Sequence, residues 1–296
     1  MTDNPFVTHR SLLFTVAYEL LGTAADAEDV VQETWLRWNA ADQDAVRNPR
    51  AYLVRTVTRQ ALNRLRTLAR RREEYVGSWL PEPVLTSPDV ADDVELAESV
   101  SMAMLTVLET LTPTERAVFV LREIFAEPFE EIAKALDKSP AAVRQIAHRA
   151  RSHVAARRPR RAVSRSEQQE VVERFRVAMA TGDIDGLMEV LAPDVVLVSD
   201  GGGVAKAFLR PIVGIDAVAR VVAAFPKKLP NGRVEELVLN GAPALRLYVD
   251  DTPDGTFSFR IENGRITHIY GVRNPHKMGK LSEPVPLTRQ GEAQPR

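Results

Sequence analysis

The sequence predicts two all-α units followed by an α+β domain, and three observations support this fold class. Apolar residues recur with helical spacing up to about residue 76, and again from about residue 96 to 154. Prolines separate these two stretches. After about residue 166 short strand-like runs appear, with Asn-Gly pairs between some of them, which is the strongest short signal for a β-hairpin. The 296 residues are also too many for one ordinary core.

The first predicted unit, residues 1–76, contains three amphipathic helices. Apolar stripes run along residues 12–20 and 27–38. A third helix begins at "NPRAYL", where Asn48 is the predicted N-cap and Pro49 occupies the first turn.

Two of these helices carry a notable polar face. One follows the sequence "DAEDVVQETWLRW", and the other is a basic stripe on the third helix. Taken alone, the first face is better explained by solvated surface, and the second is explained equally well by solvated surface and by a binding function. The acidic and amide residues of the first face are Asp29, Gln32 and Glu33, and the residues of the basic stripe are Arg55, Arg59, Asn63 and Arg66.

Residues 77–95 are predicted to form a linker. Its start, "GSWLPEPV", contains two prolines, which exclude a helix, and acidic residues follow. Trp79 and Leu80 are unusual in a linker because a solvated segment gains nothing from large apolar side chains. We therefore expect these two side chains to have an apolar partner.

The second helical unit, residues 96–158, contains a predicted helix-turn-helix. Thr112 and Glu115 form a capping box around Pro113 near its start. In "EPFEEIAKALDKSPAAVRQIAHRARSHV", Ser139 is the predicted cap of the second helix. Asp137 departs from the glycine preferred in the turn. The basic outer face of the second helix fits a DNA major groove, and the alternative is a helical hairpin with a solvated basic face. The residues expected to contact DNA are Ser139, Arg144, Gln145, His148, Arg149 and Arg151.

A basic linker, residues 159–165, precedes the predicted α+β domain at residues 166–280. Ser166 is the expected cap of a helix that ends at Gly182. The runs "VVLVS", "VEELVL", "LRLYV", "FSFRI" and "RITHIY" predict strands of a meandering antiparallel sheet. Residues 281–296 are polar and contain prolines, so we expect a flexible tail.

Composition excludes several classes of function. The formal net charge is −1, but basic blocks alternate with an acidic one, which favours a polyanionic partner for the basic parts. The absence of cysteine excludes disulfides and thiolate chemistry. We see no metal-binding spacing among the five histidines, no cofactor fingerprint, no membrane-length apolar run and no signal peptide at the start. The expectation is a cytoplasmic protein without cofactor, metal or membrane contact.

Three sequence segments, taken together and in their order along the chain, identify a family more specifically than any one segment does. "DAEDVVQETWLRW", "NPRAYLVRTVTRQALNRLR" and "EPFEEIAKALDKSPAAVRQIAHRAR" together resemble regions 2 and 4 of bacterial extracytoplasmic-function sigma factors. The resemblance implies that Asp29, Gln32 and Glu33 dock on the β′ subunit of core RNA polymerase. It also implies that residues 39–48 and the basic stripe contact the melted minus-ten promoter element, and that the second helix of the helix-turn-helix reads the minus-thirty-five element. The implied partners are core polymerase, through its β′ and β subunits, and promoter DNA, with a monomer when the chain is free.

Three further motifs resemble the sigma subgroup with a fused SnoaL-like domain of the NTF2-like cone fold. They are "WLPEPV", "DGGG" followed by a lysine, and "NPHKM". Val204 and Ala205 are additional in the second motif, and His276 and Met278 are substitutions in the third. In that subgroup the fused domain takes the place of a separate anti-sigma factor. The residues implied in interdomain regulation are Trp79, Leu80, Pro81, Glu82, Pro83, Asp200, Gly201, Gly202, Gly203, Lys206, Asn274, Pro275 and Lys277.

Our hypothesis for the linker is a latch. Trp79, Leu80 and the two prolines dock against the C-terminal domain, near residues 200–206 or 274–278. Glu82 is expected to pair with Lys206 or Lys277.

An enzymatic role for the C-terminal domain is the main alternative. NTF2-like cones include enzymes that use an acid–base pair in an apolar pocket. Here Asp200, His268 and Tyr270 are the candidates, since His268 and Tyr270 alternate along one strand and face the same side of the sheet. Packed, hydrogen-bonded side chains are the stronger explanation of the strand His and Tyr, and the expectation is a protein that is not an enzyme. The rival to the sigma-factor interpretation is a helix-turn-helix regulator fused to a ligand-binding or enzymatic SnoaL-like domain.

Overall fold

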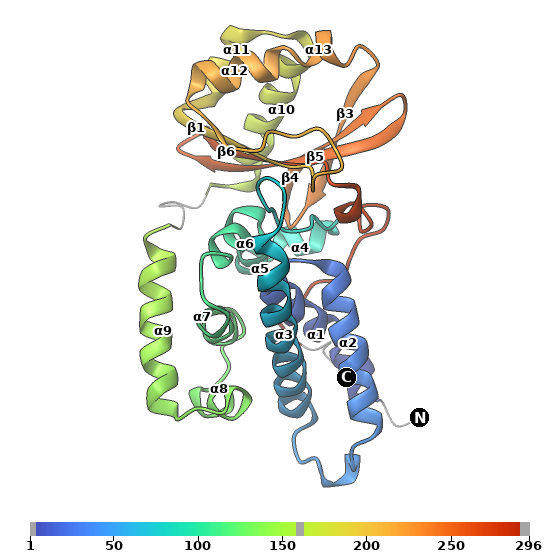
Figure 1. The fold of residues 1–296 in the computed structure, drawn as a ribbon, viewed down its shortest axis with the longest axis vertical. Coiled ribbons are helices and arrows are strands. Elements are labelled where there is room, and N and C mark those ends of the chain that lie inside the picture. Colours follow the sequence, from blue (N-terminus) through green and yellow to red (C-terminus); the bar gives the residue numbers. More distant parts are fainter. Residues whose placement is uncertain (1–3, 158–162, 291–296) are drawn as a thin grey trace.

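The helical part of the chain lies at one end of the molecule and the sheet at the other (Figure 1). The computed structural model describes residues 4–157 and 163–290. The elements of the helical part are α1 (Pro5–Leu21), α2 (Ala24–Asn39), η1 (Gln43–Ala45), α3 (Pro49–Glu73), α4 (Pro88–Asp92), α5 (Val94–Val100), α6 (Met102–Leu108), α7 (Pro113–Phe119), η2 (Val120–Ile124), α8 (Phe129–Leu136) and α9 (Pro140–Ala155). We call α1–α3 the N-terminal helical unit and α4–α9 the second helical unit.

Local helix signals in the sequence are confirmed. The Asn48 side chain accepts from the Ala51 amide at 3.0 Å, and Thr112 forms the predicted capping box. Ser139 caps α9 through the Ala142 amide at 3.2 Å. Asp137 adopts the left-handed conformation, with a φ of 53°, so the turn between α8 and α9 is made without glycine.

The two helical units share one continuous hydrophobic cluster. Buried side chains of α1, α2 and α3 pack into the same core as those of α5, α7 and α9. Arg116 of α7 is buried as well and donates from Nε to the carbonyl of Glu19 on α1 at 2.9 Å. Helical periodicity shows which face of a helix is apolar, but it does not show which other helix covers that face. The sequence therefore predicts two helical domains and does not reveal the core that they share.

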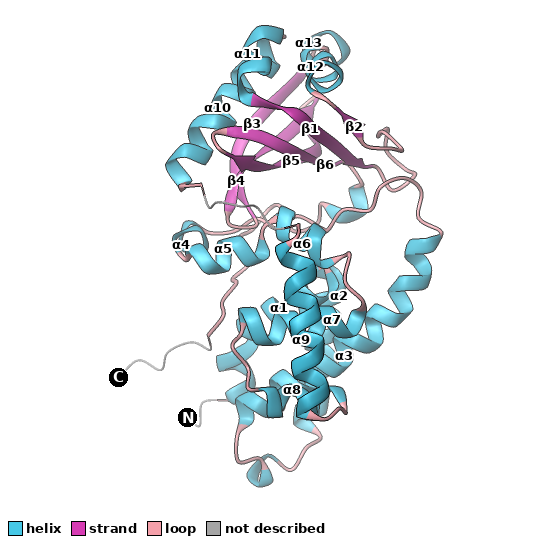
Figure 2. Ribbon diagram, turned by 90° about the vertical axis from the view of Figure 1, so that its left-hand side faces the viewer, coloured by secondary structure: helices cyan, strands magenta, loops and turns pink. Residues whose placement is uncertain are grey.

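The C-terminal domain contains a six-stranded sheet. Its elements are α10 (Arg165–Thr181), α11 (Ile184–Val190), β1 (Leu191–Asp200), β2 (Ile212–Val213), α12 (Ile215–Ala223), α13 (Phe225–Lys228), β3 (Gly232–Leu239), β4 (Ala242–Val249), β5 (Thr252–Glu262), β6 (Arg265–Val272) and η3 (Pro275–Lys277). The strand order is β2-β1-β6-β5-β4-β3. One face packs an apolar core under α10, α11 and α12, and the other face turns toward α6 and the linker (Figure 2).

Both Asn-Gly hairpins are confirmed. Asn240 and Asn263 have φ values of 53° and 51°, and each is followed by a glycine with positive φ. Such residues produce the tight turns that match the twist of the joined strands. The β3–β4 and β5–β6 pairs are antiparallel, as predicted.

Two details of this domain differ from the prediction. Ser164, and not Ser166, caps α10, since its hydroxyl accepts from the Glu167 amide. β1 runs parallel to β6, so the sheet is mixed and not a pure antiparallel meander. Pairing between strands so distant in sequence is set by the path of α12 and the later strands, and no local signal reports it.

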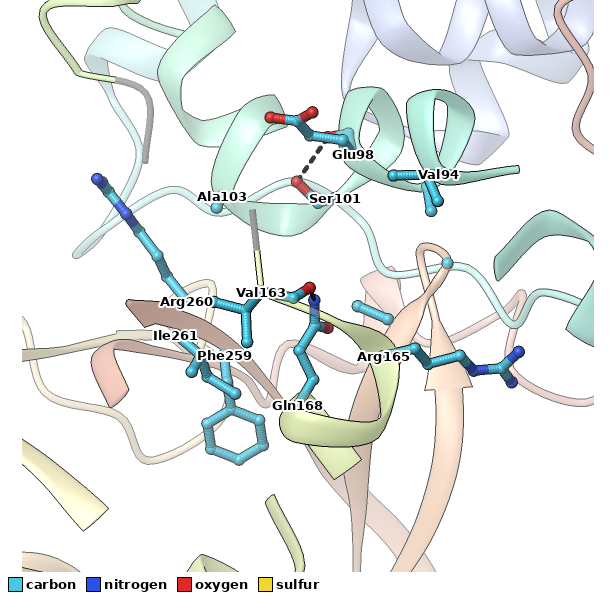
Figure 3. A pocket seen from close by; sticks show the side chains of 13 residues that line it. Val94, Glu98, Ser101, Ala103, Val163, Arg165, Gln168, Phe259, Arg260 and Ile261 are labelled. Carbon is cyan, nitrogen blue, oxygen red and sulfur yellow. Dashed lines mark hydrogen bonds between the residues drawn. The ribbon is translucent and has the colours of Figure 1, made fainter. Parts of the chain in front are cut away.

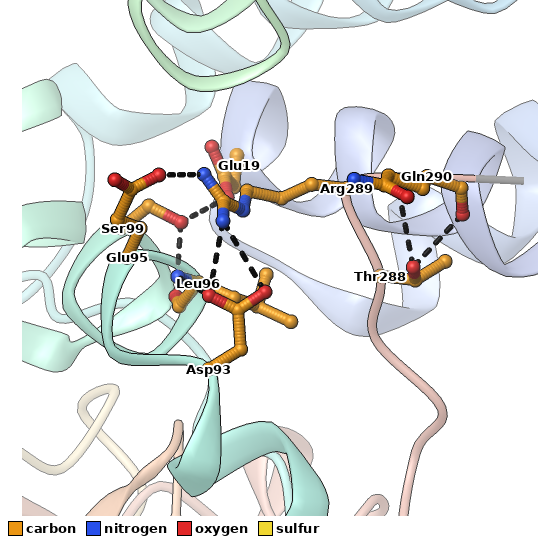
Figure 4. A network of polar contacts seen from close by, with 8 residues as sticks. All are labelled: Glu19, Asp93, Glu95, Leu96, Ser99, Thr288, Arg289 and Gln290. Atoms are coloured by element: carbon orange, nitrogen blue, oxygen red, sulfur yellow. Dashed lines mark hydrogen bonds and ion pairs between the residues drawn. The ribbon is translucent and has the colours of Figure 1, made fainter.

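The segment 281–290 is not the flexible tail that its polar sequence suggests. Leu281 and Leu287 are buried, and Leu287 joins the helical core. The Thr288 amide donates to the Thr15 hydroxyl of α1 at 3.0 Å. Arg289 pairs with Asp93 at 3.0 Å and also with Glu95 (Figure 4). Leu281 packs with Leu239 and Ala244 of the C-terminal domain, whereas Leu287 and Arg289 fasten the segment to the helical units. Residues 291–296 lie outside the described part.

Within residues 4–157 and 163–290, no helix is long and apolar enough to cross a membrane.

Candidate functional site

The three sequence motifs of the predicted latch converge on Asp200, the last residue of β1. Its carboxylate is fully buried and accepts hydrogen bonds at both oxygens. Oδ1 accepts from the Tyr75 hydroxyl at 2.6 Å and from the Gly202 amide at 3.0 Å. Oδ2 accepts from the Leu80 amide at 2.9 Å and from Lys277 Nζ at 2.7 Å. One carboxylate thus joins the end of the N-terminal helical unit, the linker and the C-terminal domain.

Lys277 is the counter-ion of Asp200 and is itself buried, with 6% of its side chain exposed. Its ammonium lies 3.1 Å from the centroid of the Trp79 ring and 5.0 Å from that of the Tyr75 ring. It also donates to the Leu80 carbonyl at 2.6 Å. Aromatic faces and a carboxylate together replace the water that a buried ammonium loses.

Glycine is needed in the loop after Asp200 because the chain passes so close to its neighbours. A Cβ on Gly202 would lie 2.3 Å from the side-chain nitrogen Nδ2 of Asn274, and Gly202 has a φ of 62°. A Cβ on Gly201 would lie 2.2 Å from the Ala205 carbonyl oxygen. Asn274 uses this closeness to donate to the Tyr75 hydroxyl at 2.8 Å.

The linker is sandwiched between the N-terminal helical unit and the C-terminal domain. Leu80 packs with Tyr270 and Val272 of β6, and with α6. Trp79 is half-buried and meets Tyr75 edge to face. Pro81 and Pro83 are buried too. The structure therefore brings Trp79 and Leu80 to the predicted segments of the C-terminal domain.

Glu82 does not pair with either predicted lysine. Its carboxylate accepts from the amides of Ala24 and Ala25, at 2.8 and 3.3 Å, in the first turn of α2. Burial raises the pKa of Glu82, and these amide hydrogen bonds oppose that rise. Glu82 binds the N-terminus of α2 and not a lysine because the helix offers two free N–H groups and a partial positive charge where the linker crosses it.

Two other residues of the junction differ from expectation. The Lys206 side chain is exposed, and only its carbonyl takes part, accepting from Arg273 at 2.8 Å. Tyr75, which the sequence did not single out, contributes both a hydroxyl and a ring. Burial, followed by the hydrogen bond to Asp200, raises the pKa of Tyr75 above its ordinary value. An aromatic residue four positions before Trp79, at the end of a helix, is the only signal that could have found it.

A second interdomain joint, also missed by the sequence, lies at the β3–β4 turn. Asn240 is buried between the two helical units and the linker. Its Nδ2 donates to the Tyr18 hydroxyl at 2.7 Å and to the Val100 carbonyl at 2.9 Å. Its Oδ1 accepts from the Val84 amide at 3.2 Å. The Asn-Gly signal predicts the turn but not its partners.

The polar face of α2 is open to solvent. Asp29, Gln32 and Glu33 are all exposed. Asp29 pairs with Arg64 of α3 at 3.0 Å, and Arg64 also binds Asp26. The face is therefore available to a partner, with one of its charges already shared inside the chain.

The basic stripe of α3 borders a hollow of about 520 Å³ between the end of α2 and α3. Three of its residues, Arg55, Arg59 and Asn63, line this hollow, together with Arg37 and Tyr52. Arg66 is exposed further along α3. Cationic groups beside an aromatic ring are the groups that hold an unstacked base and its phosphate.

The chain's own α8 occupies one part of this stripe. Arg59 donates from Nε to the Ala135 carbonyl at 3.0 Å and from a terminal nitrogen to the Lys134 carbonyl at 2.6 Å. These carbonyls belong to the last turn of α8, which favours a cation. Arg50 adds an ion pair with Glu127 at 2.6 Å. The guanidinium of Arg59 is therefore committed to the second helical unit.

The outer face of α9 carries the six predicted DNA contacts and is exposed. Arg144 pairs with Glu130 at 3.1 Å, and Arg151 with Glu123 at 3.3 Å. Arg149 lies 3.9 Å from Glu115. Ion pairs between exposed side chains are weak, so a phosphate can displace these carboxylates. Along with these three arginines, the exposed residues of the face are Ser139, Gln145 and His148.

The candidate acid–base group is turned away from the apolar core of the C-terminal domain. Tyr270 packs against Leu80 and α6, and its ring stacks on His268 with 5.9 Å between centroids. Burial and then Arg260 lower the pKa of His268, while burial raises the pKa of Tyr270. Asp200 is already fully engaged by Tyr75, Leu80 and Lys277. Asp200 therefore pairs with Lys277, while His268 and Tyr270 stack on each other.

A hollow of about 160 Å³ lies at the seam between the second helical unit and the C-terminal domain (Figure 3). Val94, Glu98 and Ser101 line it from one side, and Gln168 and Arg260 from the other. It exists only while these two parts of the chain are in contact.

Comparison with known proteins accounts for all three parts. Residues 6–71 match Sigma-70 region 2, residues 101–154 match Sigma-70 region 4, and residues 172–269 match the SnoaL-like domain. The chain is also 38% identical to the ECF RNA polymerase sigma factor SigJ of Mycobacterium tuberculosis over 294 residues, which covers 94% of this chain and 93% of SigJ. The chain belongs to the family of ECF RNA polymerase sigma factors.

This sigma factor is similar to further members of the same family. It is 32% identical to the probable ECF RNA polymerase sigma factor SigI of Mycobacterium tuberculosis, over 92% of this chain and 93% of SigI. The crystal structure of Mycobacterium tuberculosis SigJ superposes with a TM-score of 0.75 at 35% identity, over 92% of this chain and 96% of that one. The likeness extends over the helical units and the C-terminal domain together, so the predicted fold class of sigma domains followed by an NTF2-like domain is confirmed.

Proposed function

We propose that this sigma factor docks on core RNA polymerase through the exposed face of α2, on the β′ subunit, with a further contact on β. The support is the exposure of Asp29, Gln32 and Glu33 on a single helix face. The linker and the segment after the C-terminal domain reach α2 in its first turns, at Ala24 and Glu28, and the three side chains remain exposed. Acidic groups on a rigid helix give a partner both charge complementarity and a fixed register.

Promoter DNA is the second partner in this proposal. α3, with Arg55, Arg59 and Asn63 around its hollow, holds the melted minus-ten strand, and α9 enters the major groove of the minus-thirty-five element. Support comes from the exposed guanidinium groups on α9, which can bind guanine bases and phosphates. The free chain is then only partly competent, because α8 holds Arg59.

The C-terminal domain acts on these surfaces in cis, as a regulator and not as an enzyme. The observation that carries this proposal is the buried Asp200–Lys277 pair, which ties the domain to the linker between regions 2 and 4. A linker held in this way restricts how far the two regions can separate. Binding to core polymerase is expected to compete with this closed arrangement and to shift the population toward an open one.

The docking proposal is tested by charge reversal on α2. Glu33→Lys is expected to weaken binding to purified core polymerase by about 10-fold, because it places a cation on an acidic face. Fluorescence anisotropy of the labelled sigma factor measures the affinity. Glu170→Lys, on the exposed surface of α10, makes the same charge change elsewhere and should have no effect. Unchanged core affinity in the Glu33 variant would mean that the docking surface is wrongly assigned.

The DNA proposal is tested by run-off transcription with core polymerase. Arg149→Glu should reduce promoter-specific transcripts by about 10-fold or more, since one good base contact contributes about 1–3 kcal/mol of discrimination. Core affinity should stay the same. Arg174→Glu, in the exposed part of α10, is the matched control. If the Arg149 variant loses core binding instead, or if the free chain already binds promoter duplex tightly without core, the assignment of α9 fails.

A further inference from the structure

The β3–β4 turn, which belongs to none of the three latch motifs, joins the two helical units and the last residue of the WLPEPV motif. Tyr18 belongs to α1, Val84 to the linker and Val100 to the end of α5, and the Asn240 side chain hydrogen-bonds to all three. The Asn240 amide also donates to the Val84 carbonyl at 3.0 Å. With 1% of Asn240 exposed, water has no access to replace these bonds one at a time.

The β3–β4 turn packs tightly against α5. A Cβ on Gly241 would lie 2.8 Å from the Cα of Ala97 in α5, and the Gly241 amide donates to the Thr86 hydroxyl at 2.9 Å. A separation of α1 from α5 would break at least one bond of Asn240 and leave a buried polar group unpaired, which is strongly unfavourable. The turn therefore resists relative movement of the two helical units.

Separation of the two helical units would also break a contact of the basic stripe, which lies at the other end of the helices. Arg59 of the N-terminal helical unit is held by the last turn of α8, in the second helical unit. Figures 1 and 2 place α8 at the end of the molecule opposite the sheet. The C-terminal domain can therefore influence this contact only by fixing how the two helical units sit against each other.

We propose that Asn240 is a positioning residue that keeps the helical units closed and so keeps α8 on Arg59, although Asn240 touches neither of them. This rests on the proposed function, since it names the element through which the C-terminal domain controls the minus-ten surface. Coupling of this kind is reciprocal. A partner that draws α8 away from α3 must loosen the turn, and loosening the turn must favour that partner.

A distance measurement tests the proposal. The chain has no cysteine, so Asp44→Cys in η1 and Lys138→Cys beside α8, both at exposed positions, can carry a fluorescent donor and acceptor. In this labelled background Asn240→Gly keeps the positive φ and removes only the side chain. Asn263→Gly is the matched control, because Asn263 starts the same kind of turn but is exposed to solvent. We expect the open fraction to rise about 10-fold or more in the Asn240 variant and to stay unchanged in the control.

The affinity of the Asn240 variant for core polymerase distinguishes a positioning role of Asn240 from a simple loss of stability. An opened chain should bind core polymerase more tightly than the parent, whereas a merely unstable chain should bind it less tightly.

Unchanged energy transfer in Asn240→Gly would overturn the proposal. Should that variant not fold, Tyr18→Phe removes the bond to Asn240 from the opposite side, together with the bond that Tyr18 donates to the Glu82 carbonyl, and it must show a shift of the same sign, or the proposal fails. If the parent chain itself does not support transcription with core, the proposed function fails, and the energy-transfer result still decides the role of Asn240.

Discussion

Lys277→Met is expected to cost about 3–5 kcal/mol, because it leaves the buried Asp200 carboxylate without its counter-ion. The methionine fills the space between the Trp79 and Tyr75 rings but carries no charge. The linker should then detach from the C-terminal domain more often. Urea unfolding measures the loss of stability, and the rate of proteolysis within residues 77–84 measures the detachment.

A double-mutant cycle identifies the cause. Asp200→Asn removes the charge and keeps one acceptor oxygen, which can serve Tyr75 and Gly202, but it turns an NH2 group toward the Leu80 amide, so the double variant should recover only part of the stability lost in Lys277→Met. Lys206→Met is the matched control, because that side chain is exposed beside the same loop and should be nearly neutral. A cost below about 1 kcal/mol for Lys277→Met would show that the pair does not hold the junction.

Glu19→Gln is expected to stabilise the protein at pH 8, and by progressively less at lower pH. Glu19 is fully buried on α1 and accepts from the Ser99 hydroxyl at 2.8 Å. Burial raises its pKa from 4.5 to about 8, against the opposing effects of Ser99, Arg116 and Arg289. The folded chain therefore binds more protons than the unfolded chain between these values, and its stability falls as the pH rises through that window.

Glutamine keeps the acceptor for Ser99 and removes this proton dependence. The difference between variant and parent should grow as the pH rises from 4.5 to 8 and level off at about 5 kcal/mol above pH 8. Urea midpoints at pH 5.5, 7 and 8.5 measure it. Glu33→Gln, exposed on α2, is the control and should follow the parent at every pH. A pH profile of Glu19→Gln parallel to that of the parent would rule out a protonated Glu19. Glu82, whose pKa burial also raises, leaves a residual dependence of the same sign.

Most single elements of the fold could be predicted because their signals are local. The capping box at Thr112, the cap at Ser139 and the two Asn-Gly turns involve groups within a few residues of each other. Such interactions are fixed by backbone geometry and short side chains, and tertiary packing did not override them. The one cap that was misplaced, Ser166 for Ser164, differs by a single alternative serine two positions away.

The candidate site was predictable in part for a different reason. The motifs around Trp79, Asp200 and Lys277 resemble those of a known sigma subgroup, and the structure brings these residues together. Partners without such a motif were missed. No motif of that subgroup marks Tyr75 as a donor to Asp200, Asn240 as a link between α1 and α5, or Leu287 as part of the helical core.

The sequence by itself determined most of the elements, their order and the charged residues on the exposed faces of α2, α3 and α9. Only the tertiary structure decided which partner each polar group takes. Glu82 had two lysines as plausible partners by charge, and it caps α2 instead because the linker passes over the free amides of Ala24 and Ala25. The physical reason is that a buried hydrogen bond depends on position and direction to within a fraction of an ångström, and the packing of the whole chain sets both.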